Sequence, residues 1–199
     1  MKIQGVVLSQ KIITSVEDDP NSRRGFLKKA AVLTGSAILT QQELFASCPT
    51  VKSIKLRNIH QNKLYKAEFY EKDCYKLSGL FEVNKAFIDY RAHEITRIDI
   101  DLINLLYDIG THIGHDKEFS VVSGYRSKHT NNMLRRHMSG VAKDSFHTKG
   151  KAVDIYVPGV KLRKLRDIAI GLGRGGVGYY PRSNFVHVDV GPVRTWRKG

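Results

Sequence analysis

Two short segments in the last third of the chain carry branched apolar residues at every second position, with other side chains between them. In residues 150–157 the branched side chains are Val153, Ile155 and Val157, and in residues 184–190 they are Val186, Val188 and Val190. Since successive side chains of a strand point to opposite faces, each segment predicts a strand with one face in the core. When the two strands share a sheet and a core, Asp154 and His187 lie together on the opposite face.

A third candidate, His147, lies just before the first of these strands, three residues ahead of Gly150. Glycine can adopt a positive φ or allow a close backbone approach, so the chain can turn there and bring His147 back toward Asp154. Two imidazoles and one carboxylate are a ligand set that catalytic zinc uses, with a fourth position open for water. The pattern therefore predicts a metal centre formed by His147, Asp154 and His187. The alternative is an ordinary loop histidine and a hydrogen-bonded histidine–aspartate pair.

The remaining pattern predicts an α+β fold. The expected strands are residues 51–57 and 64–70, which form a hairpin, and 118–124; the expected helices are 84–91 with Asn84 as N-cap, 99–113, 131–138, and 162–172 with Gly173 at its end. We expect a central antiparallel sheet with helices packed on one face and the metal site on the other. The single tryptophan, Trp196, is expected to pack the C-terminal tail against this sheet.

The N-terminal segment resembles a bacterial twin-arginine export signal. Arg23 and Arg24 are followed by Gly-Phe-Leu-Lys, a mildly apolar stretch over residues 30–39 and small residues near Ala46. This order predicts an export signal over residues 1–46, a mature domain over 47–199, the twin-arginine translocase as a partner during export, and a periplasmic location. The alternative is a solvated basic helix start.

Two cysteines, Cys48 and Cys74, lie beyond this signal, and an oxidising compartment permits a disulfide between them. Their spacing does not establish that pairing. A second interpretation makes Cys48 a lipid-anchor cysteine, because residues 44–48 loosely resemble the end of a lipoprotein signal, although Phe45 fits that pattern poorly.

The chain of 199 residues has a formal net charge of +14, which predicts attraction to a polyanion such as nucleic acid, an anionic membrane or an acidic wall polymer. The basic residues are not organised with the aromatic platforms or recognition helices of nucleic-acid-binding proteins, and export would remove that partner. No apolar stretch reaches the roughly 18 residues that a membrane-spanning helix needs. We therefore expect neither a nucleic-acid partner nor a transmembrane span.

The motifs around the three candidate ligands resemble those of the zinc peptidases of the LAS group. Residues 145–154 follow the pattern Ser-x-His-x-x-Gly-x-Ala-x-Asp, and residues 185–189 read Phe-Val-His-Val-Asp. The likeness extends to Ser-Gly-Tyr-Arg-Ser at residues 123–127 and to residues 175–181 and 191–194, and it spans about residues 50–199. The group includes D-alanyl-D-alanine carboxypeptidases, murein endopeptidases and the hedgehog signalling domain. With the export signal included, the chain most resembles exported murein DD-endopeptidases.

The resemblance implies that His147, Asp154 and His187 bind one Zn²⁺ and that Ser123 and Arg126 contact the substrate. It further implies a periplasmic zinc metallopeptidase that acts on peptidoglycan stem peptides and hydrolyses their cross-links through a zinc-activated water. The alternatives are a non-catalytic zinc module that binds wall peptides and a D,D-carboxypeptidase of the same group.

The general base is where the chain departs from this group. Several members carry a histidine two residues, or a glutamate three residues, before the last zinc ligand, and Phe185 and Asn184 occupy those positions here. Asp189 follows His187 by two residues and shares its face of the strand. We expect Asp189 to be the catalytic base or to orient the His187 ring.

Overall fold

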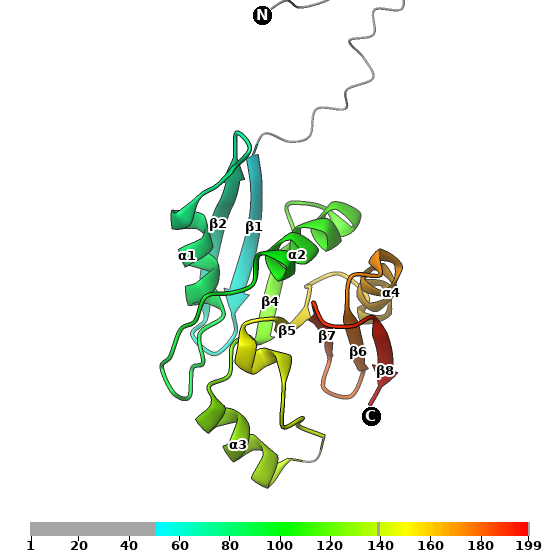
Figure 1. Ribbon diagram of the computed structural model, residues 1–199. Helices are drawn as coiled ribbons and strands as arrows, with labels where there is room; N and C mark the ends of the chain where they lie inside the picture. The colour runs from blue at the N-terminus through cyan, green and yellow to red at the C-terminus, as the bar shows by residue number, and fades with distance from the viewer. Residues whose placement is uncertain (1–50, 139, 199) are drawn as a thin grey trace, which may run out of the picture. The chain divides into compact units, whose positions relative to one another are not determined.

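The computed structural model describes residues 51–138 and 140–198 (Figure 1). These residues form one eight-stranded sheet with the strand order β3-β2-β1-β4-β5-β7-β6-β8, accompanied by four α-helices. The predicted α+β class is thereby confirmed. The predicted export signal and Cys48 lie outside the described residues, so the signal, the lipid anchor and the disulfide stay predictions; Cys74 is exposed.

The elements follow one another in a simple order. The strands are β1 (Val51–Asn58), β2 (Lys63–Glu71), β3 (Cys74–Tyr75), β4 (Glu118–Ser123), β5 (Ala152–Tyr156), β6 (Gly176–Tyr180), β7 (Phe185–Asp189) and β8 (Arg194–Arg197). The helices are α1 (Leu77–Ala86), α2 (Ile100–Ile113), α3 (Lys128–His137) and α4 (Leu162–Leu172), with a short 3₁₀ helix η2 (Phe146–Lys149). None of the helices in this part of the chain is long and apolar enough to cross a membrane.

The sheet is mixed, so the prediction of a wholly antiparallel sheet is wrong at two junctions. β1 pairs with β4 in parallel, and β6 pairs with β8 in parallel. The first parallel pair is possible because α1 and α2 lie between its strands in the chain and provide a long crossover. In the second pair, β7 is already paired with β5 and β6, so β8 adds to the free edge of β6. The chain reverses direction between β7 and β8, and β6 is antiparallel to β7, so β8 runs parallel to β6. The middle strands β4, β5, β7 and β6 are antiparallel neighbours, as predicted.

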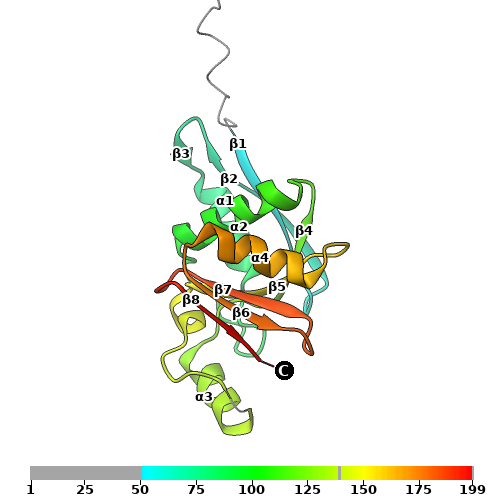
Figure 2. The same cartoon turned by 90° about the vertical axis from the view of Figure 1, so that its right-hand side faces the viewer.

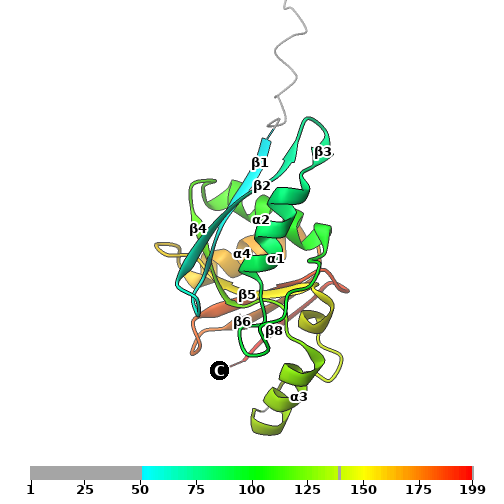
Figure 3. The same cartoon turned by 90° about the vertical axis from the view of Figure 1, so that its left-hand side faces the viewer.

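One face of the sheet carries the core. Val153 and Ile155 of β5 and Val186 and Val188 of β7 are fully buried in a single cluster, to which α1, α2 and α4 also contribute. Figures 2 and 3 show α2 and α4 on one side of these strands and α3 on the other. The predicted alternation is therefore confirmed, and it leaves the opposite face of β5 and β7 for a functional site.

Two helices differ from their predicted bounds. Asn84, the expected N-cap, lies in the last turn of α1, and its side-chain oxygen accepts a hydrogen bond from the backbone N–H of Ile98 at 3.0 Å. That helix begins at Leu77, so the prediction of a helix over 84–91 is wrong. α3 begins earlier than expected because Ser127 caps it, accepting from the N–H of Thr130. α2, α4 and the hairpin β1–β2 lie where the pattern placed them.

Candidate active site

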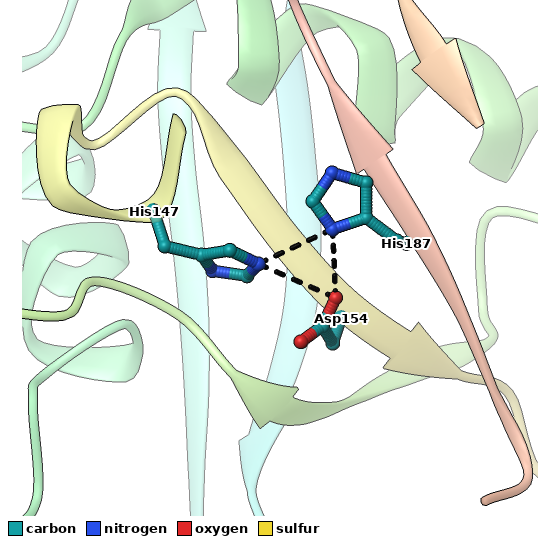
Figure 4. A group of neighbouring side chains, drawn as sticks. All are labelled: His147, Asp154 and His187. Atoms are coloured by element: carbon teal, nitrogen blue, oxygen red, sulfur yellow. Dashed lines mark hydrogen bonds and ion pairs between the residues drawn. The ribbon is translucent and has the colours of Figure 1, made fainter. Parts of the chain in front are cut away.

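His147, Asp154 and His187 lie together (Figure 4), on the face of the sheet opposite α2 and α4. Asp154 of β5 lies directly across from His187 of β7 in the antiparallel ladder. The distance from His187 Nδ1 to Asp154 Oδ1 is 2.9 Å, and His147 Nε2 lies 3.2 Å from His187 Nδ1 and 3.4 Å from Asp154 Oδ1. All three residues are buried, with exposed fractions of 1%, 8% and 9% for His147, Asp154 and His187.

The turn at Gly150 brings His147 to this position. Gly150 ends η2 with φ of 66°, in the left-handed region, and a Cβ built there would lie 2.6 Å from the carbonyl oxygen of Arg97. Both the positive φ and the close approach exclude larger residues. After this turn the chain enters β5 at Ala152, which sets His147 beside Asp154. The predicted bend is present, and it uses both properties of glycine.

The outer ring nitrogens of the two histidines fix which atoms face inward. His147 Nδ1 lies 2.7 Å from the carbonyl oxygen of Gly124, and His187 Nε2 lies 2.9 Å from Asp189 Oδ2. Both partners are acceptors, so these two nitrogens donate. In the neutral imidazoles, His147 Nε2 and His187 Nδ1 then present lone pairs toward Asp154 Oδ1. Three converging lone pairs on nitrogen and oxygen fit a cation such as Zn²⁺.

Burial and neighbouring charges set the protonation of this cluster. Burial lowers the pKa of His147, against the attraction of Asp154. Burial also favours neutral His187, but hydrogen bonds with Asp154 and Asp189 outweigh it and raise the pKa of this ring. For Asp154, burial is outweighed by the two histidines, which hold the pKa of its carboxyl far below the usual range. The cluster therefore keeps a negative charge at its centre.

Asp189 lies behind His187 rather than in front of it. Its side chain is fully buried, and its oxygens accept from His187 Nε2, from the backbone N–H groups of Gly176 and Gly191, and from two nitrogens of Arg194. Burial opposes ionisation, but the hydrogen bonds from His187 and Arg194 outweigh it and hold its pKa well below the usual range. These contacts occupy both oxygens and tie the carboxylate to one ring nitrogen of His187.

A cavity of about 610 Å³ opens over the three clustered side chains. On the β4 side it is lined by Ser123 and Arg126, and on the far side by residues of β6, β7 and β8, namely Tyr180, Phe185, Arg194 and Trp196. Asp189 is not among the described residues that line it. The structure thus gathers five of the six predicted site residues around one cavity and places the sixth behind it.

Ser123 faces this cavity because β4 is irregular at its end. Val121 lies opposite Ile155 and Ser123 lies opposite Asp154. Between these two pairs, β4 therefore contains one residue more than β5. Such a bulge turns the bulged strand and changes which side chain meets the neighbour. Ser123 is therefore brought beside Asp154.

Arg126 lines the cavity and carries a hydrogen-bond donor that has no partner among the described residues. Its Nε atom is buried without a hydrogen-bond partner among the described residues, while its backbone N–H donates to the carbonyl oxygen of His147 at 3.2 Å. Burial lowers the pKa of this guanidinium, against the attraction of Asp154. A buried donor without an acceptor is unusual in folded proteins, so a ligand oxygen is the natural partner.

The turn that follows Arg126 is held by a buried carboxylate. Asp89 is 1% exposed and accepts from the backbone N–H of Ser127 at 2.8 Å and from that of Arg91 at 3.1 Å. Burial opposes its ionisation, but the hydrogen bonds from the backbone N–H groups of Ser127 and Arg91 help to outweigh it and lower its pKa. The backbone on the C-terminal side of Arg126 is therefore fixed before any ligand arrives.

Sequence reasoning missed the part that β8 plays. Trp196 belongs to this edge strand, and its Nε1 donates to the Tyr180 hydroxyl at 2.9 Å while its ring centroid lies 5.2 Å from that of His187. The expectation that Trp196 only packs the tail against the sheet was therefore incomplete. Arg194, two residues earlier and on the same face, contacts Asp189 with two nitrogens. The alternation of Arg194 and Trp196 is the signal that could have indicated a strand facing the site.

Comparison with known proteins places this geometry in a family. Residues 46–196 match the family described as peptidoglycan L,D-endopeptidase MepK. The chain belongs to this family. The peptidoglycan L,D-endopeptidase MepK of Escherichia coli (strain K12) is 44% identical over 176 residues, which is 88% of this chain and 97% of the relative. No solved structure matches the chain significantly.

A second relative is also similar to this chain over most of the length of both proteins. The probable peptidoglycan L,D-endopeptidase MepK of Haemophilus influenzae is 39% identical over 181 residues, covering 90% of this chain and 97% of the relative. The MepK family match includes all the residues that line the cavity except Lys198, and the resemblance to murein endopeptidases is confirmed by the match. The names of these relatives specify L,D-endopeptidases, whereas the motifs alone suggested DD-endopeptidases.

Proposed function

We propose that this chain is a murein endopeptidase that hydrolyses L,D-peptide bonds in the cross-links of peptidoglycan, with one Zn²⁺ held by His147, Asp154 and His187. The observation that carries the proposal is the convergence of three lone pairs at one point of a 610 Å³ cavity in a member of the MepK family. The names of the relatives support the L,D bond.

Three residues of the chain are proposed to hold the metal, and two others are proposed to position the peptide. When bound, Zn²⁺ would polarise the peptide carbonyl and lower the pKa of a water molecule, so that hydroxide is available to attack near neutral pH. His147 Nε2, His187 Nδ1 and Asp154 Oδ1 are its ligands, and the Gly124 carbonyl keeps the His147 ring in the tautomer that binds.

Arg126 and Ser123 are proposed to hold the stem peptide. The unpaired Nε of Arg126 and its permanent charge suit a carboxylate, and peptidoglycan stems carry free carboxylates. Ser123 lies across from Asp154, where its hydroxyl can bond to the peptide backbone. Residues 47–199 keep 27 of the 33 basic and 15 of the 19 acidic residues, and this positive balance adds a long-range attraction for the anionic wall polymer.

We expect Asp189 to act by orienting His187, and not as the general base. Replacing Asp189 by asparagine should lower zinc affinity about 10- to 100-fold, because the amide accepts less strongly from His187 Nε2. The activity lost at limiting zinc should then return when zinc is added in excess. Zinc titration followed by an activity assay separates the two roles. A variant that keeps full zinc affinity but loses hydrolysis would instead identify Asp189 as the base.

The function itself is tested on defined muropeptide dimers. Residues 47–199 are incubated with zinc and with dimers cross-linked either through an L,D bond or through a D,D bond, and the products are analysed by mass. We expect monomers from the L,D-linked dimer. Survival of both dimers with zinc bound would favour the wall-binding module, and release of terminal D-alanine from monomers would favour a D,D-carboxypeptidase.

We also propose that residues 1–46 direct export to the periplasm by the twin-arginine route, where the substrate polymer lies. The supporting observation is the Arg23–Arg24 pair ahead of an apolar stretch. Replacing both arginines by lysine should retain the full-length chain in the cytoplasm, which cell fractionation measures. An unchanged periplasmic fraction would contradict this route.

A further inference from the structure

We propose that Tyr180 is a further catalytic residue, whose hydroxyl donates a hydrogen bond to the carbonyl oxygen of the bond being cleaved. The inference rests on the proposed function, because it requires a peptide carbonyl in the cavity. The three clustered residues are proposed to hold the metal and Arg126 to bind a carboxylate, so none of them is assigned to the charge that develops on that oxygen.

The register of the sheet places Tyr180 on the face of the site. Gly178 of β6 pairs with His187, and Tyr180 pairs with Phe185. Paired residues point to the same face, so Tyr180 and His187 share a face, with their strand positions two residues, or about 6 to 7 Å, apart along the strand. Tyr180 lines the same cavity as the three clustered side chains. Its neighbour Tyr179 pairs with Val186 and belongs to the core side.

Two contacts hold the Tyr180 side chain in one orientation. Its ring stacks on that of Phe185, with centroids 4.5 Å apart and an angle of 19° between the planes. Its hydroxyl oxygen accepts from Trp196 Nε1 at 2.9 Å. Trp196 can lie this close because Gly178 has no side chain: a Cβ there would lie 2.5 Å from the indole ring. The hydroxyl is therefore positioned before substrate binds.

The proton of this hydroxyl has no acceptor within residues 51–138 and 140–198. A tyrosine hydroxyl can accept and donate at once, and Trp196 uses only its accepting capacity. Tyr180 and Arg126 line the same cavity, and the Arg126 Nε is buried without a described hydrogen-bond partner. The cavity thus offers two donors, the Arg126 Nε–H and the Tyr180 O–H. Both call for oxygen atoms of a bound ligand.

The two donors suit different oxygens of a stem peptide. The permanent charge of Arg126 favours a carboxylate, whereas the neutral hydroxyl of Tyr180 suits a carbonyl oxygen. When water adds to the carbonyl carbon, a C–O bond forms, the π electron pair of the C=O bond moves onto the oxygen, and the water passes one proton to the solvent. Tyr180 bonds to that oxygen more strongly as its charge grows and keeps its own proton. When the carbonyl re-forms, the C–N bond breaks, and the leaving nitrogen keeps the electron pair and takes up a proton from the solvent.

The decisive variant is Tyr180→Phe, which removes only the hydroxyl and keeps the ring on Phe185. We expect kcat for the L,D-linked dimer to fall on the order of 100-fold. KM, zinc content and melting temperature should stay close to those of the unaltered protein. Tyr179→Phe is the matched control, because its ring lies under Arg166 and Arg197 outside the cavity, and it should leave kcat unchanged.

A second variant tests how the hydroxyl is oriented. Trp196→Phe keeps an aromatic ring beside His187 but removes the N–H donor, so kcat should fall by less than in Tyr180→Phe. Combining both substitutions should add little to the loss from Tyr180→Phe alone, because the indole acts through the hydroxyl. A double variant whose loss is the product of the two single losses would overturn this positioning role.

The unaltered protein is assayed first, so that two failures can be told apart. If it does not cleave the dimer, the proposed function fails. If it does cleave and Tyr180→Phe cleaves at the same rate, the inference about Tyr180 alone is overturned. A raised KM at unchanged kcat would also overturn it, since the hydroxyl would then bind the ground state and the transition state equally.

Discussion

Replacing Asp154 by asparagine is expected to lower the rate of cross-link hydrolysis on the order of 1,000-fold or more, because the site loses the one negative charge that we propose to hold the metal. The amide has nearly the same shape, so the strands β5 and β7 keep their pairing. What changes is the cluster: two neutral imidazoles and an amide bind a divalent cation far more weakly than two imidazoles and a carboxylate. Bound zinc per chain and kcat are the measured quantities.

Two controls make this prediction specific. Asp167→Asn removes a charge of the same kind from the exposed side of α4 and should change neither zinc content nor kcat. A chelator should abolish activity in the unaltered protein, and added zinc should restore it there but not in the Asp154 variant. An Asp154→Asn protein that retains both zinc and full activity would refute the assignment of this residue as a ligand.

Removal of the Arg126 side chain is expected to have the second largest effect. Arg126→Ala should lower kcat/KM for the dimer by about 100- to 1,000-fold, because a charged hydrogen bond in a buried setting is lost. Arg126→Lys should recover only part of that loss, since an ammonium group does not reproduce the planar fork of a guanidinium. Arg136→Ala, an exposed arginine of α3, is the matched control and should behave as the unaltered protein.

A chemical change in the substrate identifies what Arg126 binds. When the carboxylates of the stem peptide are amidated, the unaltered protein should lose much of its kcat/KM, whereas Arg126→Ala should lose little more. The two changes should therefore not multiply, because they remove the two partners of one contact. Equal losses on amidation in both proteins would show that the carboxylate binds elsewhere.

The three clustered residues could be predicted because a strand has a simple period. Valine and isoleucine at alternate positions of residues 150–157 and 184–190 determine which face is buried, and the other face then carries Asp154 and His187. The glycine after His147 supplied the second constraint, since it marks the turn that the structure contains. Local pattern was sufficient here because both strands are central and lie against the core.

What could not be predicted depends on contacts between distant segments. β6 contains two glycines in its five residues, so it shows no alternation of side chains, and nothing local indicates that Tyr180 faces the site. The parallel pairing of β8 is decided by which sheet edge is free once β7 has two neighbours. For the same reason, the surroundings of Asp189 were open to two interpretations until Arg194 was located.

Because β8 is the last strand of the described fold, it is synthesised after the residues that it supports. Asp189 and Tyr180 receive their contacts from Arg194 and Trp196, which the ribosome adds after every other element of the sheet. A growing chain therefore contains all three candidate metal ligands before their supporting strand exists. Only when this last strand of the described fold joins β6 are both supports in place, so the site is completed after every other element of the sheet has been made.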